Sequence, residues 1–326
     1  MRIPAHIALA AVAVACGGGH PTDTVPSVPP APPTVSERML AMLPPGAQVV
    51  LELDLARLRA NPVVGKIVAQ ALAERTADLP AGVPASPLAA ADQVVLAAYG
   101  VGTAQAATLT VLAAPHPPAG TTLLADGFYA LGPPDWVDQA QQRVALAGTG
   151  EARFAIRAAP ELLALRDHAM PAGAPGAALR ITARLPFDAR IALARETGLD
   201  AAPAQLSAWA DVADDLALIV DCDAADPGNR PTPGRGKGDA PTRLTATLRG
   251  AIAVLAEQPT IRALGLPSSL AGARLVTRGT WVRAIVAIGP AHLARVVERA
   301  QALLQRPASG TPGAALTGAP RGDPPP

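Results

Sequence analysis

Three stretches rich in proline and glycine limit which parts of this chain can fold. The chain has 326 residues, of which 36 are proline and 29 are glycine, and the three stretches are Gly17 to Ser36, Pro227 to Pro241 and Pro307 to Pro326. Such sequences bury too little apolar surface to offset the entropy lost on ordering. We therefore expect a tether over residues 16–38, a first folded half over 39–172, a second over 173–306 with a flexible loop at 227–241, and a disordered tail over 307–326.

The folded part must build its core from small side chains. Half of the residues are apolar, but aromatic residues make up only 2%. Lys and Arg number 27 against 26 Asp and Glu, which gives a formal net charge of +1. Because nucleic-acid binding needs a basic surface and often uses stacking aromatic rings, we expect no nucleic-acid partner. No two histidines have the spacing of zinc ligands, and Gly234 to Gly238 lacks the full phosphate-loop pattern, so we expect no cofactor.

The N-terminus carries the pattern of an export signal. Arg2 supplies a positive charge, Ile7 to Ala15 form an apolar run too short to span a bilayer, and Ala13-Val14-Ala15 ends it with small residues. The next residue is Cys16, and the whole segment resembles a bacterial lipobox. The resemblance implies that residues 1–15 are a signal peptide and that the Cys16 thiol receives a diacylglyceryl group. Two alternatives remain, namely an ordinary secretory signal that leaves Cys16 free and a buried N-terminal helix.

The folded part opens with LPPGAQVVLELDLARLR, from Leu43 to Arg59. Together with the lipobox, the Pro-rich tether and an Ala/Arg-rich C-terminal helix, this opening resembles an uncharacterised family of lipoproteins from GC-rich, myxobacterium-like bacteria. The resemblance implies a body that is held at a membrane by acyl chains on Cys16, in the cell envelope. Gly17, rather than an aspartate, follows Cys16, so we expect the outer membrane. The resemblance implies no activity.

The two halves share an order of features that predicts an α+β fold. We expect a β-α-β-β-α unit used twice, with amphipathic helices packed on antiparallel or mixed sheets; chance similarity in an alanine-rich chain is the alternative. The matching strands are 45–54 with 175–183, 91–97 with 213–220, and 128–131 with 285–288, and Gly-Pro then leads into helices at Trp136–Leu146 and His292–Leu304. We also expect helix caps at Asp54 and Asn61, helices at 160–170 and 242–264, strands at 108–113 and 274–277, and a hairpin tip at Arg278-Gly279.

One apolar strand ends in a cluster of carboxylates. Asp221, Cys222 and Asp223 follow the run Leu216 to Val220, and Asp226 comes shortly after. Alternate residues of a strand point the same way, so Asp221, Asp223 and Asp226 are our candidate ligands for a divalent cation, as in nucleotide-sugar glycosyltransferases. A solvated strand end explains the same residues. For Cys222 we expect a small buried thiol rather than a nucleophile. A nucleophile needs a base, usually histidine, and of the five histidines His6 and His20 lie in the signal and tether and His116 in a Pro-rich turn.

We find no catalytic residues in the sequence and expect a protein that is not an enzyme. The first hypothesis is a lipid-anchored binding or scaffolding module with an envelope protein as its partner. The second is a metal-dependent envelope enzyme that uses carboxylates between Asp211 and Asp226. The third is a carrier of an apolar ligand. These hypotheses differ in where the carboxylates point and in whether an exposed surface is left for a partner.

Overall fold

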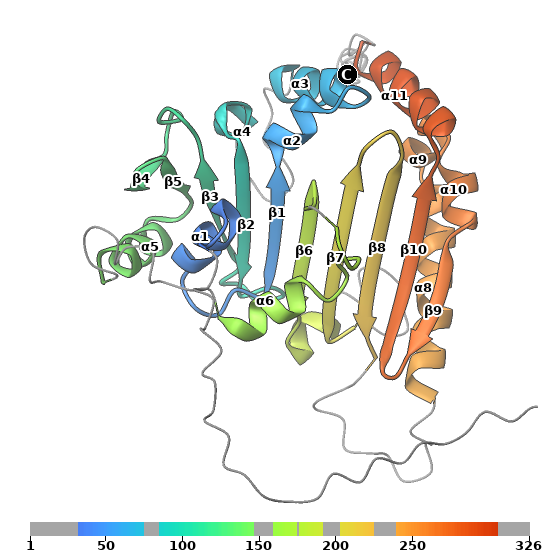
Figure 1. Cartoon of the computed structure of the whole chain (residues 1–326). Helices are drawn as coiled ribbons and strands as arrows, with labels where there is room; N and C mark the ends of the chain where they lie inside the picture. Colours follow the sequence, from blue (N-terminus) through green and yellow to red (C-terminus); the bar gives the residue numbers. More distant parts are fainter. Residues whose placement is uncertain are drawn as a thin grey trace, which may run out of the picture. The chain divides into compact units, whose positions relative to one another are not determined.

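Ten strands form one antiparallel sheet in the residues that this computed structural model describes, 32–74, 85–146, 159–174, 176–191, 203–224 and 239–305. The chain divides into two compact units, Met1–Pro32 and Pro33–Pro326, and every described helix and strand belongs to the second. The strands have the order β4-β5-β3-β2-β1-β6-β7-β8-β10-β9 (Figure 1). Helices pack on this sheet, and the predicted α+β class is therefore confirmed.

The strands and helices of this unit have definite bounds. The strands are β1 (Val49–Asp54), β2 (Gln93–Tyr99), β3 (Ala107–Ala113), β4 (Thr122–Ala125), β5 (Phe128–Leu131), β6 (Leu179–Arg184), β7 (Gln205–Val212), β8 (Leu216–Asp223), β9 (Arg274–Arg278) and β10 (Trp281–Ile288). The helices are α1 (Val35–Met42), α2 (Leu55–Ala60), α3 (Gly65–Glu74), α4 (Ala85–Ala90), α5 (Pro134–Leu146), α6 (Pro160–Arg166), α8 (Asp239–Glu257), α9 (Pro259–Leu264), α10 (Pro267–Ala271) and α11 (Pro290–Leu304).

Each half of the sheet repeats one order of strands outward from the centre. The first strands of the two halves, β1 and β6, pair with each other in the middle. Beyond them lie β2, β3, β5 and β4 on one side and β7, β8, β10 and β9 on the other. In both halves a Gly-Pro step follows the inner strand of the outer hairpin and leads to a helix, α5 or α11. The predicted duplication requires such a repeat, and the common origin of the halves stays a prediction.

The structure differs from the predicted matching of strands in the middle of each half. The sequence matches residues 91–97 with 213–220, but β2 lies next to the central strand β1 whereas β8 lies one place further out. The position equivalent to that of β2 belongs to β7, for which the sequence analysis predicts no strand. Ser207 and Asp211 interrupt its apolar pattern, and only tertiary partners explain why Ser207 is fully buried there.

The two faces of the sheet carry different layers. We call one the α6 face, because Glu52, Arg180 and Trp209 stand in register on it beneath the α6 segment; α1 and α5 cover its first half. The other, the α8 face, bears Cys222 and Val282, which pack against Leu244 of α8. Helices α2, α3, α4 and α11 contribute to clusters on this second face, and Figure 1 shows α8 and α10 behind β10 and β9.

Local capping chemistry sets several helix starts and corrects two predicted boundaries. Asp54 accepts a bond from the Arg57 backbone at 2.8 Å and caps α2 as predicted. Asn61 accepts from Val63 and Val64, but these bonds cap a turn at 62–64 that precedes α3, which begins at Gly65. Thr34 and Glu37 form a reciprocal capping box for α1. Helix α1 therefore begins inside the predicted tether 16–38, and α8 begins at Asp239 inside the predicted loop 227–241.

Proline and glycine account for further details. The predicted helix 242–264 is split into α8 and α9 at Pro259, because proline lacks the N–H that a continuous helix needs. The predicted helix 160–170 ends at Arg166 and continues as turns. The hairpin between β9 and β10 turns at Gly279, whose φ of 60° suits glycine. This hairpin tip is as predicted.

Candidate functional site

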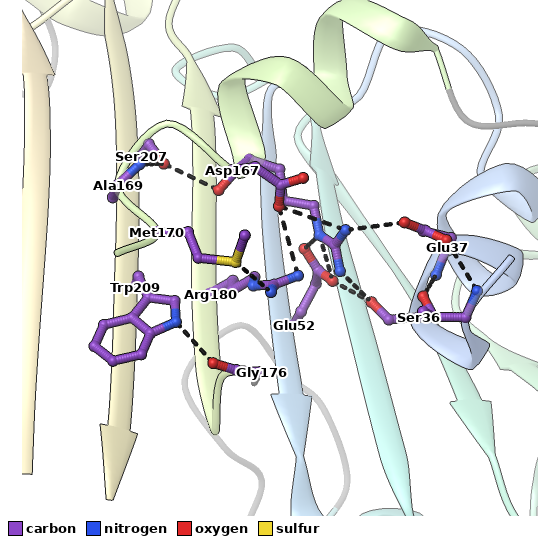
Figure 2. Close-up of polar contacts among 12 residues, drawn as sticks. Ser36, Glu37, Glu52, Asp167, Ala169, Met170, Gly176, Arg180, Ser207 and Trp209 are labelled. Carbon is purple, nitrogen blue, oxygen red and sulfur yellow. Dashed lines mark hydrogen bonds and ion pairs between the residues drawn. The ribbon is translucent and has the colours of Figure 1, made fainter. Parts of the chain in front are cut away.

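A buried cluster of charges joins the two halves on the α6 face. Arg166, at the end of α6, donates from Nε to Glu52 of β1 at 2.8 and 3.1 Å. Its other nitrogens lie 3.2 Å from the Ser36 hydroxyl and 3.7 Å from the carboxylates of Glu37 and Asp167. Ser36 also donates to Glu52. Figure 2 shows the side chains of Ser36, Glu37, Glu52 and Asp167 converging from α1, β1 and the α6 segment. We call this group the Arg166 cluster.

The stability of the Arg166 cluster depends on the balance of its charges, because the cluster is buried. The side chains of Arg166 and Glu52 are only 5% and 9% exposed. Arg180 of β6 lies beside them, 3.7 Å from Asp167 and 3.2 Å from the sulfur of Met170. Burial lowers the pKa of Arg180, and the positive charge of Arg166 lowers it further. Because removing ions from water is costly, each guanidinium here depends on the carboxylates around it.

A second cluster surrounds Asp221, whose side chain is 1% exposed. Arg283 of β10 donates to both of its oxygens, at 2.8 and 2.7 Å, and the His168 Nδ1 lies 2.8 Å away. The pKa of Arg283 is raised, mainly by its hydrogen bond to Asp221. The His168 ring stacks on Trp281 with 3.9 Å between centroids. This Asp221 cluster fixes the segment after α6 to β8 and β10.

The carboxylates of these two clusters are already paired with arginines. Every carboxylate oxygen of Glu52 and Asp221 already accepts a bond from an arginine. A general base needs a free oxygen that can reach a substrate, and the surrounding side chains leave Asp221 almost no exposed surface. The arrangement can therefore hold loops and strands in register, whereas proton transfer would require its ion pairs to break.

The structure places the predicted metal ligands only in part. Asp221 and Asp223 share the α6 face, as the alternation predicts, but Asp221 is committed to Arg283 and His168. Asp226 lies outside the described residues. Among the residues that are described, no group of three or more His, Cys, Asp or Glu side chains could hold a metal ion. The cation site at Asp221, Asp223 and Asp226 stays a prediction.

Cys222 points to the opposite face and is buried as predicted. Its side chain packs with Leu244 and Val282 and is 1% exposed. Burial, together with the negative charge of Asp221, raises the pKa of the thiol to about 12. Since the thiolate is the reactive form, Cys222 is poorly suited to act as a nucleophile near neutral pH.

Sequence reasoning missed the polar contacts between distant elements, and three of them illustrate this. Arg57 of α2 binds both oxygens of Asp211 of β7, at 2.8 and 2.5 Å. His292 of α11 lies 2.9 Å from the Gly265 carbonyl through Nε2 and 3.1 Å from the Ser269 hydroxyl through Nδ1. A carbonyl only accepts, so Nε2 donates to the Gly265 carbonyl, and Nδ1 makes a hydrogen bond with the Ser269 hydroxyl. The third is the Arg166–Glu52 pair, whose partners are 114 residues apart. No local pattern in the sequence signals such pairs.

One edge of the sheet is open among the described residues. β9 is the last strand and pairs with β10 alone, and α8 and α10 lie behind the two strands (Figure 1). Arg274 and Arg278 at its ends are exposed. The opposite edge, β4, has only four residues and a register shift between Leu123 and Ala125. The β9 edge is therefore the better candidate for binding an extended chain.

Comparison with known proteins gives a distant likeness in shape alone. No family model matches the chain, and no curated protein matches its sequence. Two solved structures of TP0453 resemble it. Crystal form I has a TM-score of 0.39 at 10% identity and covers 80% of this chain and 96% of its own. Crystal form III has a TM-score of 0.43 at 9% identity and covers 79% and 96%.

The residues predicted to direct the protein to a membrane lie outside the described part of the chain. They are Cys16, the signal peptide 1–15 and most of the tether 16–38, and the tail 307–326 lies outside it as well. Within the described residues, no helix is both long enough and apolar enough to cross a bilayer.

Proposed function

We propose that this protein is a lipid-anchored, non-enzymatic binding module of the cell envelope. Its acyl chains on Cys16 attach it to a membrane, which we take to be the outer membrane, and residues after Cys16 tether the body. The body contributes a rigid antiparallel sheet with an open edge, and its partner is an envelope protein.

The open edge of β9 supports the binding role, and the paired state of the buried carboxylates favours it over the metal-dependent enzyme. Asp221 is one of the three candidate metal ligands that the sequence singled out, and it is held by Arg283 and His168. Glu52 is held in the same way by Arg166. In some proteins, buried ion pairs are retained because they specify one arrangement of elements. We therefore assign them to a scaffold rather than to catalysis.

The anchor is tested by changing each cysteine in turn. Cys16→Ser removes the acceptor thiol, whereas Cys222→Ser is the matched control that removes the other cysteine of the chain. We expect Cys222→Ser to keep the mass of a diacylglyceryl-modified N-terminus and to sediment with membranes. We expect Cys16→Ser to lose both. Acyl chains contribute about 0.8 kcal/mol for each buried methylene, so their loss should release the protein.

Two results would contradict the anchor. One is a wild-type N-terminus that carries no lipid in intact-mass analysis. The other is a Cys16→Ser protein that stays with the membrane fraction after a high-salt wash. Density-gradient separation of inner and outer membranes tests the placement separately, since a lipidated protein found in the inner membrane would overturn only that part.

A further inference from the structure

The open edge of β9 has the geometry that strand addition requires. In an antiparallel pair the backbone groups of alternate residues point away from the partner strand. On one side, β9 pairs with β10 along its whole length, from Arg278 opposite Trp281 to Arg274 opposite Ile285. No described strand pairs with its other side. β9 therefore presents outward N–H and C=O groups that an extended chain can bond, as in β-augmentation.

The side chains of this edge carry a positive charge. Arg274 and Arg278 share the α6 face with Val276 between them, because they stand opposite Ile285, Trp281 and Arg283 of β10. Both arginines are exposed, and the described residues supply neither with an ion-pair partner. Along the sequence, residues 239–305 hold eight arginines and no lysine, against Asp239, Glu257 and Glu298.

This charge pattern argues against a second copy as the occupant. Two β9 edges that pair about a two-fold axis through Val276 would place Arg274 of one copy opposite Arg278 of the other, at both ends. Like charges directly opposite each other destabilise a strand pair, and opposite charges stabilise it. The same arginines therefore discourage self-pairing and favour a strand that carries carboxylates.

We infer that β9 binds an extended acidic segment of another protein as an additional strand. The segment would place carboxylates opposite Arg274 and Arg278, four positions apart, and an apolar side chain opposite Val276. Main-chain hydrogen bonds supply affinity, and the two arginines select the partner and its register. This inference rests on the binding role proposed above and names the chemistry of the partner.

A charge-swap experiment tests the inference. The detergent-extracted full chain is titrated with two short labelled peptides that differ only in having Glu or Lys at two positions four apart around a central Val. We expect the Glu peptide to bind the wild type about tenfold more tightly than the Lys peptide, and the Arg274→Glu/Arg278→Glu variant to reverse this preference. Arg249→Glu/Arg295→Glu is the matched control, since it changes the net charge equally at exposed arginines of α8 and α11. It should keep the wild-type preference.

Hydrogen exchange locates the bound peptide independently of charge. We expect the Glu peptide to slow exchange of amides in β9, residues 274–278, and to leave β4 at the other edge unchanged. The inference is overturned by equal binding of the two peptides, by no binding of either, by a control variant that also reverses the preference, or by protection elsewhere. A wild-type dimer in sedimentation, dissociated by Arg274→Glu/Arg278→Glu, would assign the edge to a second copy and overturn it as well. Failure of lipidation at Cys16 would leave these results untouched, so the two proposals fail separately.

Discussion

Replacing Arg166 by methionine tests whether the Arg166 cluster joins the two halves. Methionine keeps much of the side-chain volume but removes the guanidinium that donates to Glu52 at 2.8 and 3.1 Å. Glu52 would keep Ser36 as its donor and Arg180 as a neighbouring cation, but its buried charge would lose the guanidinium that donates to both of its oxygens. Breaking a buried ion pair in this way costs about 3–5 kcal/mol of the free energy of unfolding.

The control is the same substitution at an exposed pair. Arg262 pairs with Glu257, and the two side chains are 60% and 69% exposed, so Arg262→Met should cost about 0–1 kcal/mol. Urea unfolding of the detergent-solubilised full chain, followed by far-UV circular dichroism, measures both. The reasoning is refuted if Arg166→Met destabilises the protein no more than Arg262→Met does.

A double substitution separates the pair from the volume it fills. Arg166→Met combined with Glu52→Leu removes both charges and should recover part of the loss, because no unpaired carboxylate remains at position 52. We expect a coupling of about 1–3 kcal/mol between the two sites. If the losses simply add, the cluster stabilises through packing rather than through charge.

Three single sites provide further tests. Gly265→Ala should destabilise the protein by at least about 1 kcal/mol. Gly265 has a φ of 77°, and a Cβ there would meet the guanidinium of Arg299. Gly272, with a φ of −77°, is the control, and Gly272→Ala should leave stability nearly unchanged in the same urea assay. The pKa of the Cys222 thiol is raised from 9.0 to about 12, so as the pH rises the thiol ionises first in the unfolded chain. The free energy of unfolding should therefore fall between about pH 9 and 12. This fall should be steeper than in Cys222→Ala by up to about 1.4 kcal/mol per pH unit. Equal slopes would contradict this. Millimolar Ca²⁺ or Mg²⁺ should leave Tm unchanged, and a rise that Asp223→Asn abolishes would instead establish a cation site.

Three ion pairs in this body join partners that are far apart in the sequence. The Arg166–Glu52, Arg57–Asp211 and Arg283–Asp221 pairs are separated by 114, 154 and 62 residues. Each pair joins elements that the sheet has already brought into register. A change at any of them should therefore weaken the junction between elements before it weakens a single helix.

The sequence alone determined the features that depend on neighbouring residues. The cap at Asp54, the capped turn at Asn61 and the turn at Gly279 were predictable, because capping and turn chemistry act within a few residues. The capping box of Thr34 and Glu37 was equally local, and its T-x-x-E signature could have moved the predicted start of the body to α1. The buried state of Cys222 was also predictable, from the apolar run that precedes it.

Only the tertiary structure decided which strands are neighbours and which charges meet. β7 was missed because Ser207 and Asp211 break its apolar pattern, and both find partners that are far away in the sequence. The pairing of β1 with β6 turns ten strands into one sheet, and that register alone puts Glu52 beside Arg180 and beneath Arg166. Sequence periodicity shows which face of a strand is buried, but not what lies opposite, since pairing depends on contacts that no local pattern encodes.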